Sequence, residues 1–455
     1  MGAFWLARRL SPEHCIRIVN KVFAVKSVDN RVRRRHALSS VLGSLRMQLL
    51  LCVIFGLAAP ALIYTRGDFS TLTDNLSARN SLVAATVATL VGLVAVRRLS
   101  KFPGTVGASY IIPAMAGAYS IAVALILFAR APYSGVLLSM TIASSLIVRF
   151  AIGALERRSD ESLYYLVPGG HVDRIRQDFG VACITLTKPV LPTQPGGIIV
   201  ADLHHDHSAE WERTFAAAAL MGIGVYHYKQ VWEARTGMVR IEHLSENSLG
   251  SLIPSNSYAK MKRFIDIALT LLILPVLALP IVIIALLIRA DSPGPAFFRQ
   301  ERTGHRGKSF SVLKFRTMRV ADPLADYDRV SAAITKDDDD RITKLGRFLR
   351  KTRIDELPQL YNVLRGEMSW IGPRPEACAL SEWYEREIPF YSYRHIVRPG
   401  ITGWAQVNQG HVAGISEVHN KLRLDFYYIK NFSMWIDLVV LFKTVVVVIK
   451  GSGAK

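Results

Sequence analysis

Residues 264–288 read FIDIALTLLILPVLALPIVIIALLI, an apolar run long enough to span a bilayer. Pro275 and Pro280 fall in its middle and predict a kink in any helix there. Basic residues flank the run on both sides: Lys260, Lys262 and Arg263 before it, and Arg289, Arg299 and Arg302 after it. A spanning helix would place these flanks on opposite sides, against the positive-inside rule. A re-entrant helix that enters and leaves one leaflet satisfies both signals, and a fifth span tilted by its prolines is the alternative.

Four apolar segments precede this run and predict a bundle of four transmembrane helices within residues 47–150. They cover residues 47–64, 82–96, 110–129 and 133–150. Arginine and lysine gather before the first segment, after the second and after the fourth, whereas the first connecting loop balances two arginines against two aspartates. The positive-inside rule therefore places both ends of the bundle in the cytoplasm, with residues 1–46 as a basic cytoplasmic segment.

The bulk composition agrees with a membrane protein that meets anionic partners. Half of the 455 residues are hydrophobic and the mean hydropathy is +0.24. A net charge of +20 suits anionic lipid headgroups and phosphorylated ligands. Nucleic acid is the competing partner, but no zinc-finger spacing or helix-turn-helix pattern supports it. The four cysteines form neither a disulfide framework nor a CxxC motif, which favours a cytoplasmic location for the soluble parts.

Residues 156–256 alternate predicted strands and helices, which indicates a Rossmann-like cytoplasmic α/β domain. Strands are predicted at residues 181–186, 197–203 and 224–228, and a helix at residues 209–220. The absence of a GxGxxG motif disfavours a bound dinucleotide. Three histidines and an aspartate at residues 204–207 raise the alternative of a metal site. A solvated loop that leads into a helix capped by Ser208 is the preferred interpretation.

The C-terminal part of the chain carries the candidate chemistry. In residues 309–318, the alternation of a strand places Lys314 and Arg316 on one side, where they can share a phosphate or carboxylate. A solvated cationic face is the alternative. The aspartates at residues 337–340 precede an amphipathic stretch at residues 341–352. They suit a divalent cation, but acidic residues also favour the start of a helix, and that interpretation is preferred.

The sequence RKTRIDELPQL at residues 350–360 is the strongest local candidate for phosphoryl chemistry. Pro358 suits a first helical position and Gly366 a C-terminal cap, so a short helix is predicted between them. Asp355 and Glu356 then lie at its start, close to upstream arginines. One carboxylate can attack phosphorus and its neighbour can bind Mg²⁺, while arginines stabilise charge on phosphate oxygens. A surface charge cluster at a helix start is the alternative.

Two further segments hold an arginine beside proline and glycine. Arg374 lies in IGPRP at residues 371–375, and Arg398 lies in VRPGITGW at residues 397–404. Proline fixes φ and glycine permits close backbone approach, so both loops suit rigid presentation of a guanidinium to a phosphate. Turn formation explains either loop alone. Both loops, combined with the adjacent carboxylates, predict a phosphoryl-transfer site.

Together these motifs resemble the monotopic phosphoglycosyl transferases, bacterial sugar transferases that are also called polyprenyl-phosphate hexose-1-phosphate transferases. The resemblance covers residues 260–450, and the N-terminal bundle with its α/β insert is similar to the large form of this family. It rests on residues 262–266 with the proline-broken run, and on residues 300–318, 355–360, 371–375 and 398–408. The implied fold is a membrane protein with four transmembrane helices, a Rossmann-like insert, and a monotopic α/β catalytic domain with a re-entrant helix at residues 264–288.

The resemblance also implies an activity and the residues that perform it. Hexose-1-phosphate passes from a UDP-sugar to undecaprenyl phosphate and UMP is released, the initiating step of exopolysaccharide, capsule or O-antigen synthesis. Asp355 matches the family nucleophile, which forms a sugar-phospho-aspartate, and Glu356 matches its Mg²⁺ ligand. The matched phosphate-binding positions are Arg350, Arg374, Arg398, Lys314 and Arg316. The break of the re-entrant helix falls at Pro280, with Pro275 added, where the family often has Ser-Pro.

The implied location is the bacterial inner (cytoplasmic) membrane, with several spans and the catalytic domain on the cytoplasmic face. The implied partners are the UDP-sugar, undecaprenyl phosphate and membrane lipid, without nucleic acid, and a homodimer stays open. Direct attack by the lipid phosphate, without a covalent intermediate, is one alternative. A non-enzymatic membrane scaffold that recruits polysaccharide assembly proteins is another. The sugar and the role of the insert stay open.

Overall fold

The computed structural model describes residues 41–450 except 42, 69, 101, 103–109, 158–163, 174, 176–182, 193–196, 240–253, 320–340 and 410–414. The predicted acidic run at residues 337–340 and most of the basic N-terminal segment lie outside the described residues. The chain divides into two compact units. The first ends at Trp232, and residues 233–455 form most of the second.

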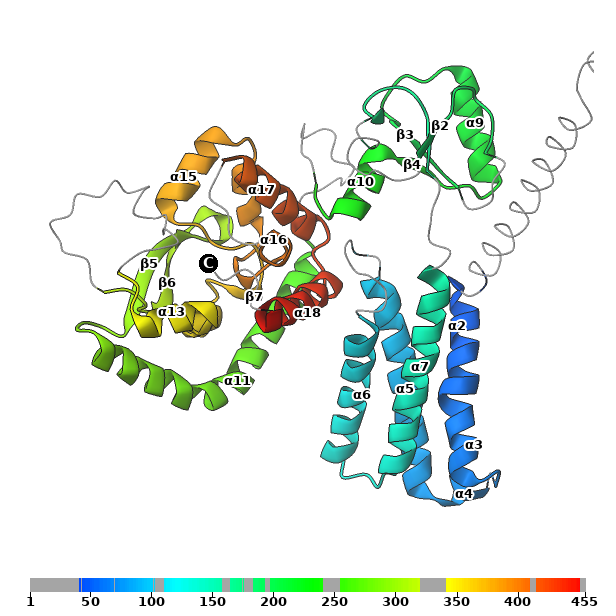
Figure 1. Ribbon diagram of the computed structural model, residues 1–455, viewed down its shortest axis with the longest axis horizontal. Helices are drawn as coiled ribbons and strands as arrows, with labels where there is room; N and C mark the ends of the chain where they lie inside the picture. Colours follow the sequence, from blue (N-terminus) through cyan, green and yellow to red (C-terminus); the bar gives the residue numbers. More distant parts are fainter. Residues whose placement is uncertain are drawn as a thin grey trace, which may run out of the picture. The chain divides into compact units, whose positions relative to one another are not determined.

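The first unit contains a helix at each of the four predicted apolar segments. The first is continuous through α2 (Leu45–Leu51), the π-helix η2 (Cys52–Ala58) and α3 (Ala59–Thr65), and the others are α5 (Leu76–Leu99), α6 (Ile111–Phe128) and α7 (Gly135–Arg157), with the short α4 (Ser70–Asp74) before α5 (Figure 1). All four reach the length and hydropathy of membrane spans. Helix α5 is longer than predicted because it begins in polar sequence, where the Asn75 side chain accepts hydrogen bonds from Ser77 N and Ala78 N.

Hydroxyl side chains and a glycine hold these helices together in their interior. The Tyr119 hydroxyl lies 2.8 Å from Thr89 Oγ1 and 3.3 Å from Ser145 Oγ, so it links α6 to α5 and α7. A Cβ at Gly56 would lie 2.8 Å from Ser145 Oγ, so glycine is needed where η2 approaches α7. The outward-facing residues include exposed apolar side chains such as Val83 and Ile147, which suits contact with lipid.

A four-stranded parallel sheet forms the α/β part of the first unit. Its strands are β1 (Tyr164–Leu166), β2 (Cys183–Thr185), β3 (Ile198–Ala201) and β4 (Val225–His227), in the order β2-β1-β3-β4. Helix α9 (Ala209–Leu220) follows β3, and α10 (Tyr228–Thr236) follows β4 (Figure 1). Leu166 and Val200 face one apolar core, and Tyr165 and Ile199 face the other, so both sides of the sheet are covered. The structure confirms the three predicted strands and adds β1.

The second unit combines short strand pairs with helices. Strands β5 (Phe297–Thr303) and β6 (Ser309–Phe315) form an antiparallel hairpin through the 3₁₀ turn η4 (His305–Gly307), and β7 (Ser369–Ile371) pairs in parallel with β8 (Gly400–Thr402). The helical elements are α11 (Asn256–Asp291), α13 (Lys344–Lys351), η5 (Ile354–Gln359), α14 (Leu360–Arg365), α15 (Cys378–Glu387), η6 (Tyr391–Ile396), α16 (Trp404–Asn408), α17 (Ile415–Lys430) and α18 (Met434–Lys450). Helix α13 is shorter than the predicted amphipathic stretch.

Helix α11 is the long apolar helix of this unit and contains both prolines. Its most apolar stretch of 18 residues has a mean hydropathy of 3.2, and only 6% of this stretch is buried. The helix bends along its length (Figure 1). Proline removes a backbone hydrogen bond and crowds the preceding turn, which explains why the helix bends. The helix continues past both prolines. The helix begins earlier than predicted, because Ser255 caps it by accepting a hydrogen bond from Tyr258 N.

Candidate active site

The adjacent carboxylates lie on η5, directly after the chain reverses direction. Arg353 adopts a left-handed conformation with φ of 59° between α13 and η5, and Asp355 and Glu356 follow in the first turn of η5. Ile354 and Leu357 pack against the apolar core around Phe315, which turns the two acidic side chains the other way. Both carboxylates are buried, at 9% and 7% exposure. The predicted short helix is therefore a 3₁₀ turn through Pro358 that continues into α14.

Three cationic groups surround the Glu356 carboxylate. Its Oε1 lies 3.0 Å from Arg374 Nη2, 3.3 Å from Lys314 Nζ and 3.8 Å from Arg353 Nη1. Burial alone would raise the pKa of Glu356, but these three positive charges outweigh it and hold the pKa far below the usual range. Glu356 is therefore ionised at any ordinary pH.

Asp355 differs from its neighbour in its electrostatic surroundings. Burial and the negative charge of Glu356 raise its pKa, although Lys314 and Arg374 oppose this change. A carboxylate whose charge is less stabilised is more basic, and a more basic oxygen is the better nucleophile. The pair therefore consists of one firmly held anion and one more reactive carboxylate.

Lys314 and Arg350 reach this site from two other elements. Lys314 is on β6, opposite Phe298 of β5, and burial lowers its pKa while Glu356 raises it in part. Arg350 is in the last turn of α13, where its Nε donates to Thr317 Oγ1 at 2.9 Å. Its positive charge lowers the pKa of Asp355. The structure thus brings Lys314, Arg350 and Arg374 of the predicted cations to the acid pair, as well as Arg353.

The structure gives Arg316 and Arg398 other contacts. Arg316 donates from Nη1 to Pro293 O and from Nη2 to Ser292 O, both at 2.7 Å, and so binds the carbonyls at the end of α11. Arg398 Nε donates to Gly366 O at 3.0 Å, at the end of α14. The described contacts place both residues at the ends of helices. Phosphate binding by either residue stays a prediction.

Arg302 also approaches the site, although it was not among the predicted phosphate-binding residues. Its guanidinium donates to Pro375 O at 2.6 Å and to Gln300 Oε1 at 2.6 Å. Its charge contributes to the lowered pKa of Lys314. Alternate residues of a strand share a face, so Phe298, Gln300 and Arg302 lie on one face of β5, and Phe298 is opposite Lys314 of β6. The same alternation that indicated Lys314 would therefore have indicated Arg302.

The two loops that carry Arg374 and Arg398 pack backbone against backbone. A Cβ at Gly372 would lie 2.4 Å from Arg398 O, and a Cβ at Gly400 would lie 2.0 Å from Gly372 N. Gly372 N donates to Thr402 O at 2.8 Å, within the pairing of β7 with β8. Only glycine fits at these two positions, which fixes the loop that carries Arg374 relative to its neighbour.

Among the residues that the structure describes, two groups qualify for a metal ion on ligand type. Asp355 and Glu356 offer adjacent carboxylates, which together with the phosphate oxygens of a ligand are the oxygen donors that Mg²⁺ prefers. The firm ionisation of Glu356 fits this role, since its described contacts all involve Oε1. The acid pair therefore fits Mg²⁺ by its donor set.

The second group lies in the α/β part and consists of Asp202, His204 and His227, whose ligand atoms lie within 4.8 Å of one another. His204 Nδ1 and His227 Nε2 are 2.7 Å apart, and Lys229 N donates to His227 Nδ1 at 3.0 Å. The neutral His227 ring therefore carries its proton on Nε2 and donates it to His204. If a metal bound His227 Nε2, the proton of the neutral ring would be on Nδ1 and would face the Lys229 N–H. A hydrogen bond between the two histidines therefore fits better than a metal site.

The predicted loop at residues 204–207 leads into α9 as expected. Ser208 takes the N-cap position with extended φ and ψ, but its side chain makes no capping hydrogen bond. Asp202, which was not part of the predicted cluster, accepts the backbone N–H groups of His171 and His204 instead. This carboxylate organises the carboxyl ends of β1 and β3.

Comparison with known sequences gives a consistent picture. The sequence profile described as bacterial sugar transferase matches residues 257–451. The chain is 41% identical over 377 residues to a UDP-N-acetylgalactosamine-undecaprenyl-phosphate N-acetylgalactosaminephosphotransferase of Aeromonas hydrophila, which covers 83% of this chain and 88% of that protein.

Two other relatives match a shorter part of the chain. A UDP-glucose:undecaprenyl-phosphate glucose-1-phosphate transferase of Escherichia coli (strain K12) is 44% identical over 187 residues, 41% of this chain and 39% of that protein. An exopolysaccharide production protein PSS of Rhizobium leguminosarum bv. phaseoli is 44% identical over 191 residues, 41% of this chain and 94% of that protein.

Proposed function

Because the chain belongs to the bacterial sugar transferases, we propose that its Asp355-Glu356 site transfers a sugar phosphate from a UDP-sugar to undecaprenyl phosphate. The enzyme is an undecaprenyl-phosphate sugar phosphotransferase, and this reaction initiates the synthesis of an exopolysaccharide or related glycan. The observation that carries the assignment to this site is the buried pair of carboxylates among Lys314, Arg350 and Arg374.

The proposed reaction has two steps on phosphorus. A carboxylate oxygen of Asp355 attacks the phosphorus atom that bears the sugar, the bond to the UMP oxygen breaks, and UMP leaves with the electron pair. An oxygen of undecaprenyl phosphate then attacks the phosphorus of the sugar-phospho-aspartate and releases Asp355. Lys314, Arg350 and Arg374 stabilise the charge that develops on the phosphate oxygens.

Glu356 and Asp355 are the residues that would hold Mg²⁺ in this proposal. When bound, the cation would neutralise charge on the phosphate groups of the donor. Arg374 keeps the Glu356 side chain in place, since it donates from Nη2 to Oε1 at 3.0 Å. Glu356 thereby orders the cations around Asp355 as well as offering a metal ligand.

The contacts of α11 support a re-entrant helix. At one point Trp370 Nε1 donates to Thr270 Oγ1 at 2.9 Å, and further along Ile281 and Ile288 pack against the core that contains Phe315. Nearer its start, Lys262 Nζ pairs with Asp437 Oδ2 at 2.5 Å. Lys262 and Ile288 are 26 residues apart, about 39 Å along a straight helix, which exceeds the hydrocarbon thickness of about 30 Å. A unit on one side of the membrane can therefore make both contacts with a re-entrant helix but not with a spanning one.

The remaining topology follows from the basic flanks. Arg97 and Arg98 end α5, and the four apolar helices of the first unit supply an even number of crossings. With both ends of these helices in the cytoplasm and a re-entrant α11, the catalytic unit lies on the cytoplasmic face of the inner membrane. The protein is then a multi-pass membrane protein whose active site faces the pool of nucleotide sugars.

UDP-N-acetylgalactosamine is the first donor to test. The relative from Aeromonas hydrophila, named for this sugar, matches over 83% of the chain, whereas the glucose transferase from Escherichia coli matches over 41%. A donor specificity shared with the first relative would agree with the longer match.

Release of UMP tests the function directly. We expect the protein in nanodiscs with undecaprenyl phosphate and Mg²⁺ to release UMP from one or more of a panel of UDP-sugars, and chelation of Mg²⁺ to abolish this release. Asp355→Asn removes the nucleophile and should abolish turnover, while Asp206→Asn on an exposed loop serves as the matched control. Near-normal turnover by Asp355→Asn would show that the nucleophile is assigned wrongly.

The covalent step has its own readout. Without undecaprenyl phosphate, a donor labelled in the sugar should leave label on the wild-type protein and none on Asp355→Asn. UMP release that requires the acceptor, with no label on the protein, would favour direct attack by the lipid phosphate. Binding to polysaccharide assembly proteins, with no UMP release from any donor, would favour a scaffold.

A further inference from the structure

The loop that carries Arg374 is held at four successive carbonyl groups. The oxygens of residues 373–376 accept hydrogen bonds from Gly400 N (2.9 Å), Arg394 Nη2 (2.9 Å), Arg302 Nη1 (2.6 Å) and Thr303 N (3.0 Å), in that order. Two donors are backbone amides and two are guanidinium groups. The carbonyl of Arg374 itself therefore depends on the Arg394 side chain.

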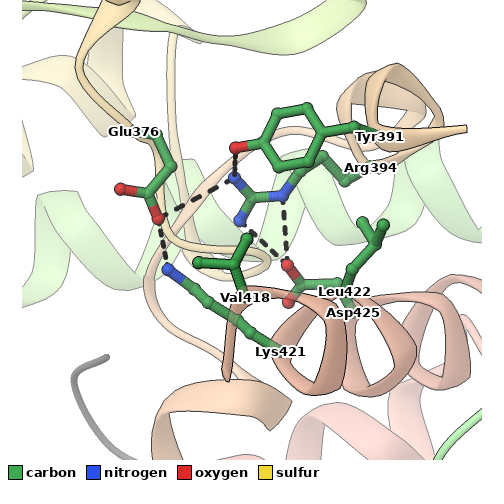
Figure 2. Close-up of a pocket in the computed structure, with 7 residues that line it drawn as sticks. All are labelled: Glu376, Tyr391, Arg394, Val418, Lys421, Leu422 and Asp425. Carbon is green, nitrogen blue, oxygen red and sulfur yellow. Dashed lines mark hydrogen bonds and ion pairs between the residues drawn. The ribbon is translucent and has the colours of Figure 1, made fainter. Parts of the chain in front are cut away.

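Arg394 is buried at 3% exposure and is held from two sides (Figure 2). Its Nε and Nη2 donate to Asp425 Oδ2 at 3.1 and 2.8 Å, and its Nη1 donates to the Tyr391 hydroxyl at 2.8 Å. Asp425 is on α17, and Tyr391 and Arg394 are on η6. These bonds fix the plane of the guanidinium, so that one remaining N–H of Nη2 meets the Arg374 carbonyl.

A second ion pair completes the cluster and returns to the same loop. Glu376 Oε1 contacts Lys421 Nζ and lies 3.9 Å from Arg394 Nη1 (Figure 2). Burial would raise the pKa of Glu376, but Lys421 and Arg394 hold it well below the usual range. Two buried cations thus face two buried carboxylates, and Glu376 attaches α17 to the loop two residues after Arg374.

The interior of this cluster does not admit a ligand. Val418 and Leu422 close the space between the charged groups, and the gap is too narrow for a water molecule. The cluster therefore acts through the backbone it holds. The nearest functional group along that backbone is the Arg374 guanidinium, which contacts Glu356 at 3.0 Å.

We propose that Arg394, oriented by Asp425 and Tyr391, is a positioning residue that fixes the Arg374 backbone and thereby aims the Arg374 guanidinium at Glu356 and at the donor phosphate. The role in the reaction rests on the function proposed above. Arg394 acts through Arg374, so the loss of Arg394 matters only as long as Arg374 has its side chain.

Kinetics of paired variants test this dependence. Arg394→Lys keeps the charge but cannot bind Asp425, Tyr391 and the Arg374 carbonyl at once, and we expect kcat to fall on the order of 10–100-fold, since misplacement by about 1 Å costs rates of this size. Arg386→Lys on the exposed side of α15 is the matched control and should keep wild-type kcat. In the Arg374→Ala background, Arg394→Lys should cause little further loss. A further loss equal to that of Arg394→Lys alone would overturn the proposal.

Tyr391→Phe offers a milder change that keeps the buried ring. It removes one acceptor of Arg394, so we expect a smaller fall in kcat that also disappears in the Arg374→Ala background. Wild-type kcat for Tyr391→Phe together with a non-additive effect of Arg394→Lys would assign the orientation to Asp425 alone and overturn the part played by Tyr391.

Hydrogen–deuterium exchange of the membrane-embedded protein tests the same idea without catalysis. The amides of residues 369–377 should exchange faster in Arg394→Lys and in Tyr391→Phe than in the wild type, and at the wild-type rate in Arg386→Lys. Unchanged exchange in a folded Arg394→Lys protein would overturn the positioning role. Faster exchange in a protein whose wild type releases no UMP would leave the positioning intact and reject the proposed function instead.

Discussion

A single carboxylate oxygen, Glu356 Oε1, is approached by three positively charged side chains of the active site. Lys314, Arg353 and Arg374 all approach Glu356 Oε1, and each comes from a different element. In a buried site, the removal of one partner leaves the others unpaired and desolvated, which costs more than the pair itself contributes. Glu356 therefore orders these three cations, in addition to the part proposed for it in the reaction.

Replacement of Glu356 by glutamine should destabilise the protein in a pH-dependent way. Loss of a buried, paired charge costs about 3–5 kcal/mol at neutral pH. The folded-state pKa of Glu356 lies below the unfolded value near 4.5, so its stabilisation is complete above that value and is lost as the pH falls. Thermal unfolding in nanodiscs should show a large gap between wild type and Glu356→Gln at pH 7 that narrows below about pH 4.5.

Glu387→Gln, on the exposed side of α15, is the control for this measurement and should unfold like the wild type at each pH. A gap that stays constant from pH 7 to acidic pH would show that the charge of Glu356 is not the source of the stability.

At the scale of residues, the sequence predicted those contacts that depend on local pattern. The adjacency of Asp355 and Glu356 and the glycines beside Arg374 are local features, and the structure places them together. Arg316 was expected beside Lys314 because alternate residues of a strand share a face, but β6 ends at Phe315. The role of Arg394 depends on Asp425, 31 residues later, and no local pattern indicates that contact.

At the scale of elements, α11 shows how two local signals combine. Its prolines predicted a kink, and the structure has one continuous helix that bends along its length (Figure 1). Arg316 binds the carbonyls of Ser292 and Pro293, directly after the C-terminal end of this helix. A helix tolerates proline when the exposed backbone groups of the preceding turn find other partners or when the helix bends away. The strand β1 was not predicted, and its β identity comes from pairing with β2 and β3.

The proposed re-entrant orientation of α11 predicts that both of its ends are reached from one side of the membrane. In a cysteine-free background, Lys260→Cys and Asp291→Cys place a thiol at the two exposed ends. A membrane-impermeant maleimide should label both in inside-out vesicles and neither in right-side-out vesicles. Both ends lie on the same side in this proposed arrangement, because one catalytic unit contacts the helix before Pro275 and after Pro280, and the positive-inside rule makes that side the cytoplasm.

Tyr133→Cys, in the connection between α6 and α7, supplies the opposite control, since the positive-inside rule places this connection outside. It should react only in right-side-out vesicles. Labelling of Asp291→Cys from the same side as Tyr133→Cys would establish α11 as a fifth span and reject the re-entrant helix.

At the scale of the whole molecule, the part of the chain that matches the family profile is distinct from the first unit, which precedes it. The profile of the family matches residues 257–451, and the relative from Rhizobium leguminosarum bv. phaseoli has 94% of its length within a match of 191 residues. The apolar helices and the α/β sheet of the first unit precede the residues of the profile match. The chemistry of sugar-phosphate transfer is therefore expected to reside in the second unit alone.

The second unit nevertheless begins before the profile match. Trp404, buried at 2% exposure, donates from its indole Nε1 to Gly237 O at 2.8 Å. Val239 N donates to Arg423 O at 2.9 Å, and Lys430 pairs with Glu233 at 2.7 Å. The segment from Glu233 to Val239 thus belongs to the fold of the catalytic unit, although it directly follows the α/β sheet in sequence.

Two truncated chains separate these contributions. A chain of residues 233–455 keeps the contacts of that segment with Trp404, Arg423 and Lys430, and we expect it to enter the membrane and to release UMP at a rate close to that of the full chain. A chain of residues 254–455 leaves the buried indole N–H of Trp404 without its acceptor, which costs about 1–3 kcal/mol. It should unfold at a lower temperature and lose activity faster on incubation, with an initial rate similar to that of the longer chain.

Trp404→Phe in the full chain removes the same hydrogen bond while it keeps a large ring on Tyr427, so it should reproduce part of the lowered unfolding temperature. Equal stability of the two truncated chains would show that the segment at residues 233–239 is dispensable for the catalytic fold. A folded but inactive chain of residues 233–455 would show instead that the first unit takes part in the reaction.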